Sequence, residues 1–592
     1  MATLRAALRL GCADPKALGA MLALILVGAA PPLGVAWFTK LLFDEVSKGG
    51  AASPSTATWY AVTIAGLGAV AAIANRVSGY FTTALQNAIT IAADVQLYRK
   101  LNTFLGLGPF EQPALRDRLA LAQQAANQAP YAVVMFAVGV AQNVVTLGGF
   151  AAILTSLWPP AGLLLLAVAV PDFFIQLRLS RRAAQAVEDS ASLFRARFLF
   201  QAVLTDLRAA REVRLYQLGR FFHDRLTGAV RGAARIELAA ARHVTVVQTC
   251  WALAGAAVTL TATVIAVNAA VRGRLSLGDL TLLLAAFGAA HAGLAGIAGQ
   301  LGDAGAAMRL FRHYVAVLDS PADLADGTLP APPLRSGIRF EDVWFRYDEG
   351  GPWILRGVDL TIPAGEAIGL VGLNGAGKST LVKLLCRFYD PDRGRITWDG
   401  VDLRELRVET LRQRMGAVFQ DFMCYDLTAA ENVGIGRLPH TAEQVEEAAA
   451  RAEIHDRLRA LPHGYDTLLS RTFADQDGEP GVTLSGGQWQ RVALARSLMR
   501  ADADLLILDE PSSGLDADAE TRVHASLARI RQGRTGLLVS HRLGTLRDAQ
   551  RIVVLDAGRV VESGAHDELM TADGEYARLF RLQADGYQLA PS

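Results

Sequence analysis

The chain has 592 residues, of which 52% are hydrophobic and only 19% are charged, and its formal net charge is +1. Soluble proteins usually have about a quarter of their residues charged, so this composition favours membrane-spanning segments. The length exceeds that of one ordinary domain, and we expect two or more. The near-zero net charge argues against a general affinity for nucleic acid.

The four cysteines are scattered along the chain and include no Cys-x-x-Cys pair. Metal sites and disulfide frameworks usually show paired or regularly spaced cysteines, so we expect neither. We interpret the cysteines as small buried hydrophobic residues in a reducing compartment. They are Cys12, Cys250, Cys386 and Cys424.

Six long apolar stretches occupy the first 300 or so residues. Each is near or above the roughly 20 residues that a helix needs to cross a bilayer. A soluble helical core would need six helices with almost no polar face, so we predict six membrane spans. They lie at about 17–41, 58–85, 130–157, 160–177, 244–271 and 276–300.

Basic residues predict the orientation of these spans, because Lys and Arg are enriched in cytoplasmic loops. Arg5 and Arg9 precede the first span, and residues 178–243 contain thirteen arginines. The connection at Lys48 is poor in basic residues, and the one at 158–160 has no charge. We therefore expect a multi-pass membrane protein with both ends in the cytoplasm. The Ala- and Arg-rich, Lys-poor composition favours a bacterial inner (cytoplasmic) membrane.

The first apolar stretch continues to about Leu42, which is too long for the core of a secretory signal. We interpret it as a retained span. The segment before it has apolar residues at helical spacing with two arginines, and two interpretations are open. It either lies on the membrane surface or is a disordered terminus.

The long cytoplasmic connections resemble amphipathic helices rather than loops at residues 92–110 and 191–230. We expect the spanning helices to continue into the cytoplasm there. A segment rich in Pro and Asp follows the last span and marks a domain boundary. The predicted division is a transmembrane domain at 1–318, a linker at 319–336, an α/β domain at 337–582 and a tail at 583–592.

A phosphate-binding loop is predicted at residues 372–380, which read GLNGAGKST. An apolar strand at 366–372 precedes it and a helical segment follows it, which is the context such a loop needs. Glycines let backbone N–H groups approach phosphates, and the helix N-terminus favours negative charge. Lys378 would then reach the β- and γ-phosphates of a nucleotide, and Ser379 would ligate Mg²⁺.

A second apolar strand, ADLLILDEP at 503–511, ends in Asp509 and Glu510. These two acids lie at the carboxyl end of a buried strand, where α/β proteins bind ligands. We expect Asp509 to hold Mg²⁺ through water and Glu510 to polarise the attacking water of a phosphoryl transfer.

Five motifs resemble those of ATP-binding cassette (ABC) proteins in order and spacing: GLNGAGKST, LSGGQ, LLILDEP, SSGLD and SHR. Six predicted spans before one cassette resemble the exporter-type (type IV) half-transporter. The resemblance implies a multi-domain fold, with an all-α six-helix transmembrane domain followed by an α/β P-loop domain that binds ATP and Mg²⁺. Two departures from the family pattern, Gly514 in SSGLD and Trp489 after LSGGQ, remove no catalytic group.

The resemblance implies roles for individual side chains. Tyr347 corresponds to the aromatic residue that stacks on adenine, and Gln420 to the glutamine that contacts Mg²⁺. Glu510, His541 and Gln420 are the implied catalytic residues, and Ser379, Gln420 and Asp509 are implied at the metal. The implied ATP-binding residues are Tyr347, Gly372, Asn374, Gly375, Gly377, Lys378, Ser379, Thr380, Ser485, Gly486, Gly487, Gln488 and Asp516.

The stretch TLSGGQWQR at 483–491 predicts a partner subunit. In the resembled family two cassettes meet head to tail, and LSGGQ of one closes over ATP on the other. A homodimer is the simplest expectation because the chain keeps each catalytic element, and a heterodimer with a degraded partner is the alternative. Segments around 107–115 and 212–219 are expected either to transmit the closure or only to pack helices, and Glu479 is a candidate contact to the membrane domain.

The implied function is ATP-driven export by alternating access, and the substrate stays open among lipids, hydrophobic drugs, peptides and secondary metabolites. Import with the same fold, or ATP-gated regulation of a channel or complex, are the alternatives. Polar side chains inside the spans are costly and usually face a cavity or a partner. Arg76 and His291 are the cavity candidates, and the other polar residues are Gln142, Asn143, Asp172 and Gln248.

Overall fold

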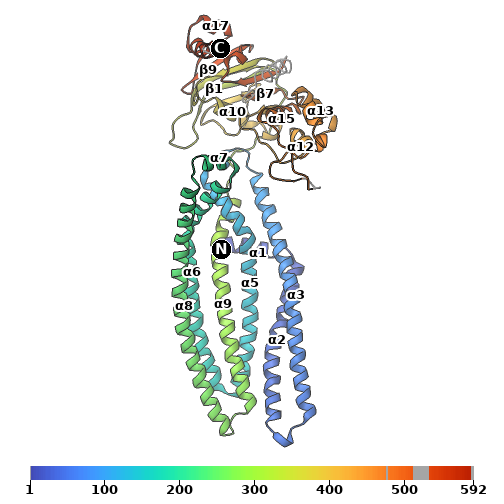
Figure 1. Ribbon diagram of the computed structural model, residues 1–592, viewed down its shortest axis with the longest axis vertical. Coiled ribbons are helices and arrows are strands. Elements are labelled where there is room, and N and C mark those ends of the chain that lie inside the picture. Colours follow the sequence, from blue (N-terminus) through green and yellow to red (C-terminus); the bar gives the residue numbers. More distant parts are fainter. Residues whose placement is uncertain (1, 475–477, 511–532, 548, 589–592) are drawn as a thin grey trace. The chain divides into compact units, whose positions relative to one another are not determined.

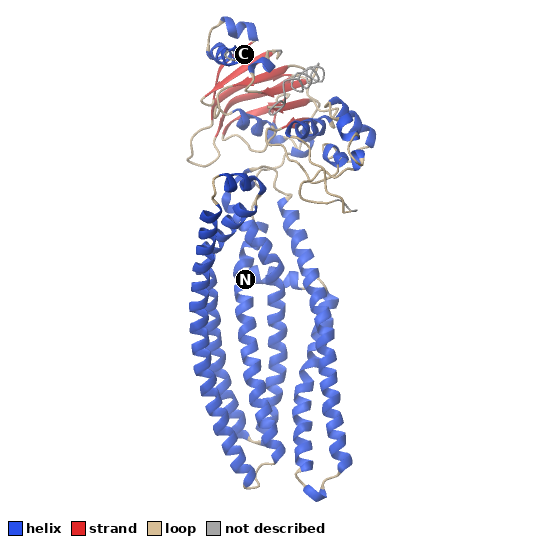
Figure 2. Cartoon of the chain, viewed as in Figure 1, coloured by secondary structure: helices blue, strands red, loops and turns tan. Residues whose placement is uncertain are grey.

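The computed structural model describes residues 2–474, 478–510, 533–547 and 549–588, which form two compact units. The first unit, Met1–Asn102 with Pro113–Ser320, is helical. The second unit, Thr103–Gln112 with Pro321–Ser592, contains the described strands (Figures 1 and 2). The predicted order, an all-α domain followed by an α/β domain, is confirmed.

Long helices dominate the first unit, and a short 3₁₀ turn (Gly49–Ala51) lies between two of them. The helices are α1 (Ala2–Gly11), α2 (Pro15–Val46), α3 (Pro54–Leu101), α5 (Pro113–Leu157), α6 (Pro159–Thr205), α7 (Leu207–Leu215), α8 (Gly219–Val271) and α9 (Leu277–Leu318).

Local sequence signals set the ends of these helices. Asp14 caps α2, because its carboxylate accepts hydrogen bonds from the backbone N–H groups of Lys16 and Ala17, each at 3.0 Å. Ser276 and Asp279 form a reciprocal capping box at the start of α9. The short turns between helices are therefore encoded by the residues at the turns themselves.

Each predicted span falls within one of the long helices, which extend well beyond the apolar stretches as expected. Four described segments are long and apolar enough to cross a bilayer, and Leu277–Ala290 is a shorter apolar one. The spans at 160–177 and 276–300 stay predictions. The four segments are Pro15–Val46, Pro54–Leu101, Leu121–Ser156 and Gly219–Val271.

The helices of the first unit pack mainly in pairs: α5 along α9, α2 along α3, and α6 along α8 (Figure 1). Charged groups also join α2 to the beginning of α9. The Lys40 ammonium lies 2.8 Å from the Asp279 carboxylate, and Asp44 accepts a hydrogen bond from the backbone of Gly278 at 2.9 Å.

Among the cysteines, Cys386 is buried but Cys12, Cys250 and Cys424 are exposed in the single chain, so the expected burial is wrong for these three.

The second unit contains two sheets. A four-stranded antiparallel sheet has the order β2-β1-β4-β5, and a six-stranded, mainly parallel sheet has the order β10-β9-β3-β8-β7-β6. The central strands β3, β7 and β8 are buried along their whole length, which matches their unbroken apolar sequences. The strands are β1 (Gly337–Phe345), β2 (Leu355–Pro363), β3 (Ala367–Val371), β4 (Arg393–Trp398), β5 (Val401–Asp402), β6 (Met415–Val418), β7 (Leu505–Asp509), β8 (Thr535–Val539), β9 (Arg551–Asp556) and β10 (Arg559–Gly564).

The described helices of this unit are mostly short, and 3₁₀ turns lie at Leu403–Glu405, Gly464–Asp466 and Leu543–Leu546. The helices are α4 (Gly108–Glu111), α10 (Lys378–Leu385), α11 (Val408–Gln413), α12 (Ala429–Gly434), α13 (Ala442–Arg451), α14 (His455–Arg459), α15 (Gly486–Leu498), α17 (His566–Thr571) and α18 (Glu575–Gln588).

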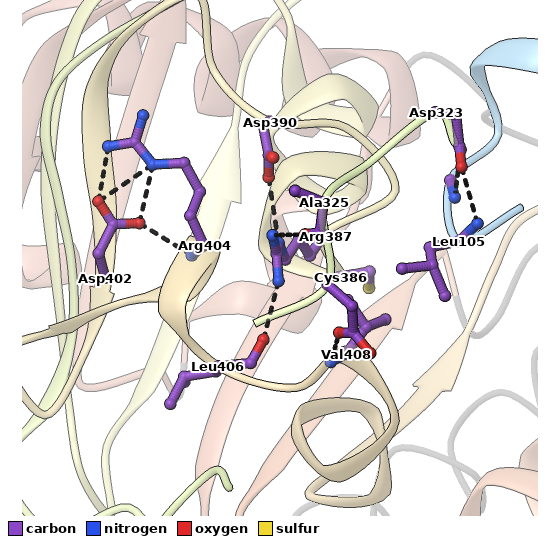
Figure 3. A network of polar contacts seen from close by, with 12 residues as sticks. Leu105, Asp323, Ala325, Cys386, Arg387, Asp390, Asp402, Arg404, Leu406 and Val408 are labelled. Carbon is purple, nitrogen blue, oxygen red and sulfur yellow. Dashed lines mark hydrogen bonds and ion pairs between the residues drawn. The ribbon is translucent and has the colours of Figure 1, made fainter. Parts of the chain in front are cut away.

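Residues Thr103–Gln112 group with the second unit although they lie between α3 and α5 in the sequence. The Asp323 carboxylate accepts hydrogen bonds from the backbone N–H groups of Leu105 (2.9 Å) and Gly106 (2.6 Å), as Figure 3 shows. Only glycine fits at position 106, because a Cβ there would collide with the carbonyl oxygen of Phe388. We name Thr103–Gln112 the docking segment.

Arg387 joins several backbone segments close to this contact (Figure 3). Its guanidinium is almost completely buried, lies 3.1 Å from Asp390, and donates hydrogen bonds to the carbonyl oxygens of Leu406 (2.8 Å) and Ala325 (2.7 Å). A buried guanidinium is stable only when such partners replace water. Arg387 therefore attaches the segment after α9 to the α/β domain.

We predict that Arg387→Ala destabilises the α/β domain by about 2–4 kcal/mol, because carbonyl and carboxylate groups lose a buried partner. Arg395→Ala is the matched control: it removes an ion pair with Glu341 whose side chains are 58% and 38% exposed. Such a pair contributes at most about 1 kcal/mol. Calorimetric unfolding of the detergent-solubilised chain measures both, and equal shifts of the cassette transition would contradict the assignment.

Candidate functional site

The predicted phosphate loop, residues 372–377, joins the end of β3 to the first turn of α10. Gly377 has φ +107°, which is the left-handed region that L side chains rarely adopt, and it lies directly before the helix. Backbone N–H groups at the N-terminus of α10 therefore face the end of the loop. This is the strand, turn and helix that the sequence predicts.

Lys378 is the first residue of α10, and its ammonium folds back onto the phosphate loop. It donates hydrogen bonds to the carbonyl oxygens of Gly372 (2.7 Å) and Leu373 (3.1 Å). Burial lowers the Lys378 pKa, although the nearby Glu510 and Asp509 oppose this shift. A half-buried cation whose described hydrogen bonds go to carbonyl groups is well suited to pair with an anionic ligand.

Asp509 ends β7 and is only 6% exposed. Burial raises its pKa to about 6, with a further increase from the Glu510 charge, against the opposing charge of Lys378. A carboxylate that is desolvated to this degree fits a hard divalent cation, which prefers oxygen ligands. Ser379 is exposed in the first turn of α10, which follows β3, and β8 lies between β3 and β7 in the sheet.

The three predicted catalytic side chains converge at Glu510. One carboxylate oxygen of Glu510 accepts a hydrogen bond from the Gln420 amide at 2.9 Å, and the other lies 3.1 Å from His541 Nδ1. Gln420 follows β6, Glu510 follows β7 and His541 follows β8, so three parallel strands deliver these groups to one edge. Glu510 has φ +53°, an uncommon backbone conformation for a residue with a side chain, and it is typical of functional sites.

Sequence reasoning missed Gln490 as part of this arrangement. It lies on α15, and its amide donates a hydrogen bond to the Glu510 carbonyl oxygen at 3.0 Å. It lies within the stretch TLSGGQWQR, but a glutamine inside a helix is most often a surface residue, so no role was assigned to it. Its burial is the signal, and burial becomes visible only once α15 packs beside β6.

Tyr347 lies just beyond β1, and the residue is 41% exposed. Its hydroxyl is 3.1 Å from the Thr380 hydroxyl on α10. The aromatic platform that the sequence predicts is therefore beside the phosphate loop. Lys383 and Tyr389, which sequence reasoning did not single out, contact the same ring.

The LSGGQ residues form the start of α15. Ser485 caps this helix in a reciprocal capping box with Gln488, and Gly486 and Gly487 fill its first turn. Among the described residues, no hydrogen bond joins 485–488 to the phosphate loop of the same chain. Asp516 lies outside the described residues.

The remaining predicted positions are dispersed. Arg76 is exposed on α3 and Asp172 is buried on α6, while Gln142 and Asn143 are half-buried on α5. Gln248 on α8 donates a hydrogen bond to Gln176 on α6 at 3.2 Å. Glu479 is exposed in a loop, and the side chain of His291 is outside the described residues.

Comparison with known proteins agrees with this geometry. Residues 355–513 match the family model described as ABC transporter. The whole chain is similar to a solved bacterial Atm1-family ABC exporter with ATP bound, with a TM-score of 0.80, 25% identity, and coverage of 98% of this chain and 99% of the other. The chain has the fold of an exporter-type ABC half-transporter. Its second unit is an ATP-binding cassette, and its helical unit belongs in a membrane.

Curated relatives match over a smaller part. An ATP-dependent lipid A-core flippase of Alkalilimnicola ehrlichii is 46% identical over 272 residues, which are 46% of this chain and 44% of the relative. ATP-binding cassette sub-family B member 6 of Xenopus tropicalis is 43% identical over 258 residues, 43% of this chain and 29% of the relative. The match with this chain thus spans less than half the length of these curated relatives.

We predict that Asp509→Asn stabilises the nucleotide-free chain at pH 8 by about 1–3 kcal/mol. The Asp509 pKa is raised from 3.8 to about 6, so the folded protein binds this proton more tightly than the unfolded chain does. Its ionisation costs stability as pH rises from about 4 to 6, and the full cost is present above pH 6.

Thermal unfolding without nucleotide at pH 8 and pH 5 measures this effect. The gain from Asp509→Asn should be largest at pH 8 and should shrink at pH 5. Asp502→Asn, at a side chain that is 71% exposed, is the control and should change neither midpoint. A gain that is equal at both pH values would contradict the cause given for the pKa shift.

Proposed function

We propose that the chain is one half of an ATP-driven exporter that moves a lipid-type substrate away from the cytoplasmic side of a membrane. The convergence of Gln420, Glu510 and His541 beside the phosphate loop is the observation that carries the proposal. The similarity to an ABC exporter over nearly the whole chain and the lipid A-core flippases among the relatives support export and a lipid-type cargo.

In this proposal the phosphate loop and Lys378 bind the triphosphate, and Tyr347 stacks on the adenine. Lys378 exchanges its hydrogen bonds to Gly372 and Leu373 for bonds to phosphate oxygens. Ser379, Asp509 and Gln420 would hold Mg²⁺, which supplies charge neutralisation at the transferred phosphoryl group. Burial disfavours the charged form of the Asp509 carboxylate, and a bound cation would offset this desolvation cost.

Glu510 is held on both carboxylate oxygens, by Gln420 and by His541. To orient a water molecule for attack, one of these oxygens must accept a hydrogen bond from that water. We propose that His541 turns to the γ-phosphate when ATP is bound, which frees the Glu510 oxygen for water. Because Gln420 would bind both Mg²⁺ and Glu510, their hydrogen bond would couple the orientation of the Glu510 carboxylate to the binding of Mg²⁺.

The LSGGQ turn of one subunit completes the site of the other in this proposal. The N-terminus of α15, capped by Ser485, presents backbone N–H groups and a favourable dipole to the γ-phosphate. A homodimer is the simplest assembly, because Lys378, Glu510, His541 and the LSGGQ residues are present in this one chain. Two equivalent sites would then form across the twofold axis.

We predict that Glu510→Gln lowers the ATPase rate by about 100-fold or more while leaving ATP affinity within a few-fold. The amide keeps the shape of the side chain but does not attract the proton of the attacking water. Steady-state hydrolysis and equilibrium binding of a fluorescent ATP analogue measure the two effects. Unchanged turnover would assign the water-polarising role to another residue.

The direction of transport is tested in proteoliposomes whose cassettes face outward. A fluorescent phospholipid in the outer leaflet should become protected from dithionite when ATP and Mg²⁺ are added, and Glu510→Gln should abolish this. ATP-dependent exposure of lipid from the inner leaflet would contradict export. ATP hydrolysis without lipid movement would contradict the lipid-type cargo.

A further inference from the structure

Near its end, the docking segment has a carboxylate with two partners in the cassette. Glu111 is the last residue of α4, and one of its oxygens lies 2.7 Å from the Lys383 ammonium. The other accepts a hydrogen bond from the Tyr389 hydroxyl at 2.5 Å. Burial tends to raise the Glu111 pKa, but these two donors outweigh it and hold the pKa below its ordinary value, so the carboxylate is ionised at neutral pH.

Both partners of Glu111 also contact Tyr347. The Lys383 ammonium lies 5.2 Å from the centre of the Tyr347 ring, within the range of a cation–π contact. The Tyr389 ring meets the Tyr347 ring edge to face, with centroids 5.4 Å apart and an interplanar angle of 86°. The Phe345 ring packs against both tyrosine rings, with its centroid 5.1 Å from that of Tyr347 and 5.4 Å from that of Tyr389.

Tyr347 is thus held on one side by side chains that Glu111 orients, and its hydroxyl is held by Thr380. We propose that Glu111 is a positioning residue for nucleotide recognition: through Lys383 and Tyr389 it holds Tyr347 in the orientation that stacks on adenine. This inference rests on the stacking role of Tyr347 in the proposed function.

Without the Glu111 charge, the Lys383 ammonium and the Tyr389 hydroxyl lose their shared acceptor. Both side chains are then free to move away from the Tyr347 ring. Ordering the Tyr347 side chain on nucleotide binding then costs conformational entropy, which offsets part of the free energy gained by stacking on the base. Conversely, a base on Tyr347 stabilises the two side chains, Lys383 and Tyr389, that hold Glu111. Base stacking and attachment of the docking segment are therefore energetically coupled, and the coupling acts equally in both directions.

The docking segment continues directly into α3 on one side and α5 on the other. Any change in how firmly Glu111 is held is passed to these two helices through the main chain. The base of the nucleotide, and not only its phosphates, thereby contributes to fixing the cytoplasmic ends of two long helices.

The test compares ATP with ribose 5′-triphosphate, which has the phosphates and sugar but no base, as hydrolysis substrates of the full chain in nanodiscs. Glu111→Gln should raise the KM for ATP by about 3- to 10-fold, in the range of measured coupling between sites, with kcat nearly unchanged. The KM for ribose 5′-triphosphate should not change. Lys383→Met should reproduce this pattern.

Asp323→Asn is the matched control, because Asp323 holds the same segment through the backbone of Leu105 and Gly106 without contacting Tyr347 or its partners. It should affect both substrates alike. In a Tyr347→Ala background, Glu111→Gln should raise the KM for ATP no further.

The outcomes separate this inference from the proposed function. If Tyr347→Ala leaves the preference for ATP over ribose 5′-triphosphate intact, the stacking role itself is wrong. If Tyr347→Ala abolishes the preference but Glu111→Gln does not reduce it, the positioning role is wrong. Equal effects of Glu111→Gln on both substrates would reduce Glu111 to a structural anchor and overturn the inference.

Discussion

The parallel pairing of β3, β8, β7 and β6 is the constraint on which the site depends. In this sheet Leu370 pairs with Val539, Asp509 with Val539 and Val418 with Leu508, so the four strands end at the same edge. The residues that follow them are the phosphate loop, His541, Glu510 and, two residues beyond Val418, Gln420. Groups from distant parts of the chain meet because carboxyl ends of parallel strands cannot separate without loss of the ladder. The buried apolar strands therefore determine the geometry of the proposed catalytic site as much as the polar residues do.

The site stores unfavourable electrostatics that a nucleotide and a cation would relieve. Lys378 is turned onto carbonyl groups, Asp509 is desolvated beside Glu510, and Glu510 has an uncommon backbone conformation. Each feature costs stability in the nucleotide-free chain, and binding recovers that cost. Part of the free energy of ATP binding would therefore come from relieving these unfavourable features of the nucleotide-free site. This contribution would help ATP binding to drive a large rearrangement.

Much of this arrangement could be predicted from the sequence, because short motifs encode it locally. GLNGAGKST predicts a strand, a turn and a helix, and unbroken apolar strands followed by acids predict the position of Asp509 and Glu510. The long helices could be predicted as well, since α2 and α9 carry their own caps at Asp14 and Ser276. These features depend on neighbouring residues, so a single sequence contains them.

Contacts between distant segments could not be predicted in the same way. The attachment of Thr103–Gln112 to the cassette depends on Asp323, Lys383 and Phe388, which belong to no motif and lie more than two hundred residues from that segment in the sequence. Gln490, Lys383 and Tyr389 were missed for the same reason, since each acquires a role only through a partner in another element. The assembly of two subunits could also not be predicted in detail. The LSGGQ turn indicates that a second chain binds, but the geometry of the assembly depends on that second chain.

The most direct measurement of the central claim, that each ATP site is shared between two subunits, mixes two inactive variants. Ser485→Arg blocks the LSGGQ turn and Lys378→Ala removes the phosphate-binding ammonium, and each variant alone should hydrolyse almost no ATP. A mixed dimer contains one site with both groups intact, so co-assembly should restore up to about a quarter of the wild-type rate. A mixture no more active than either variant alone would contradict the account, because a site built within a single chain cannot be restored by a partner.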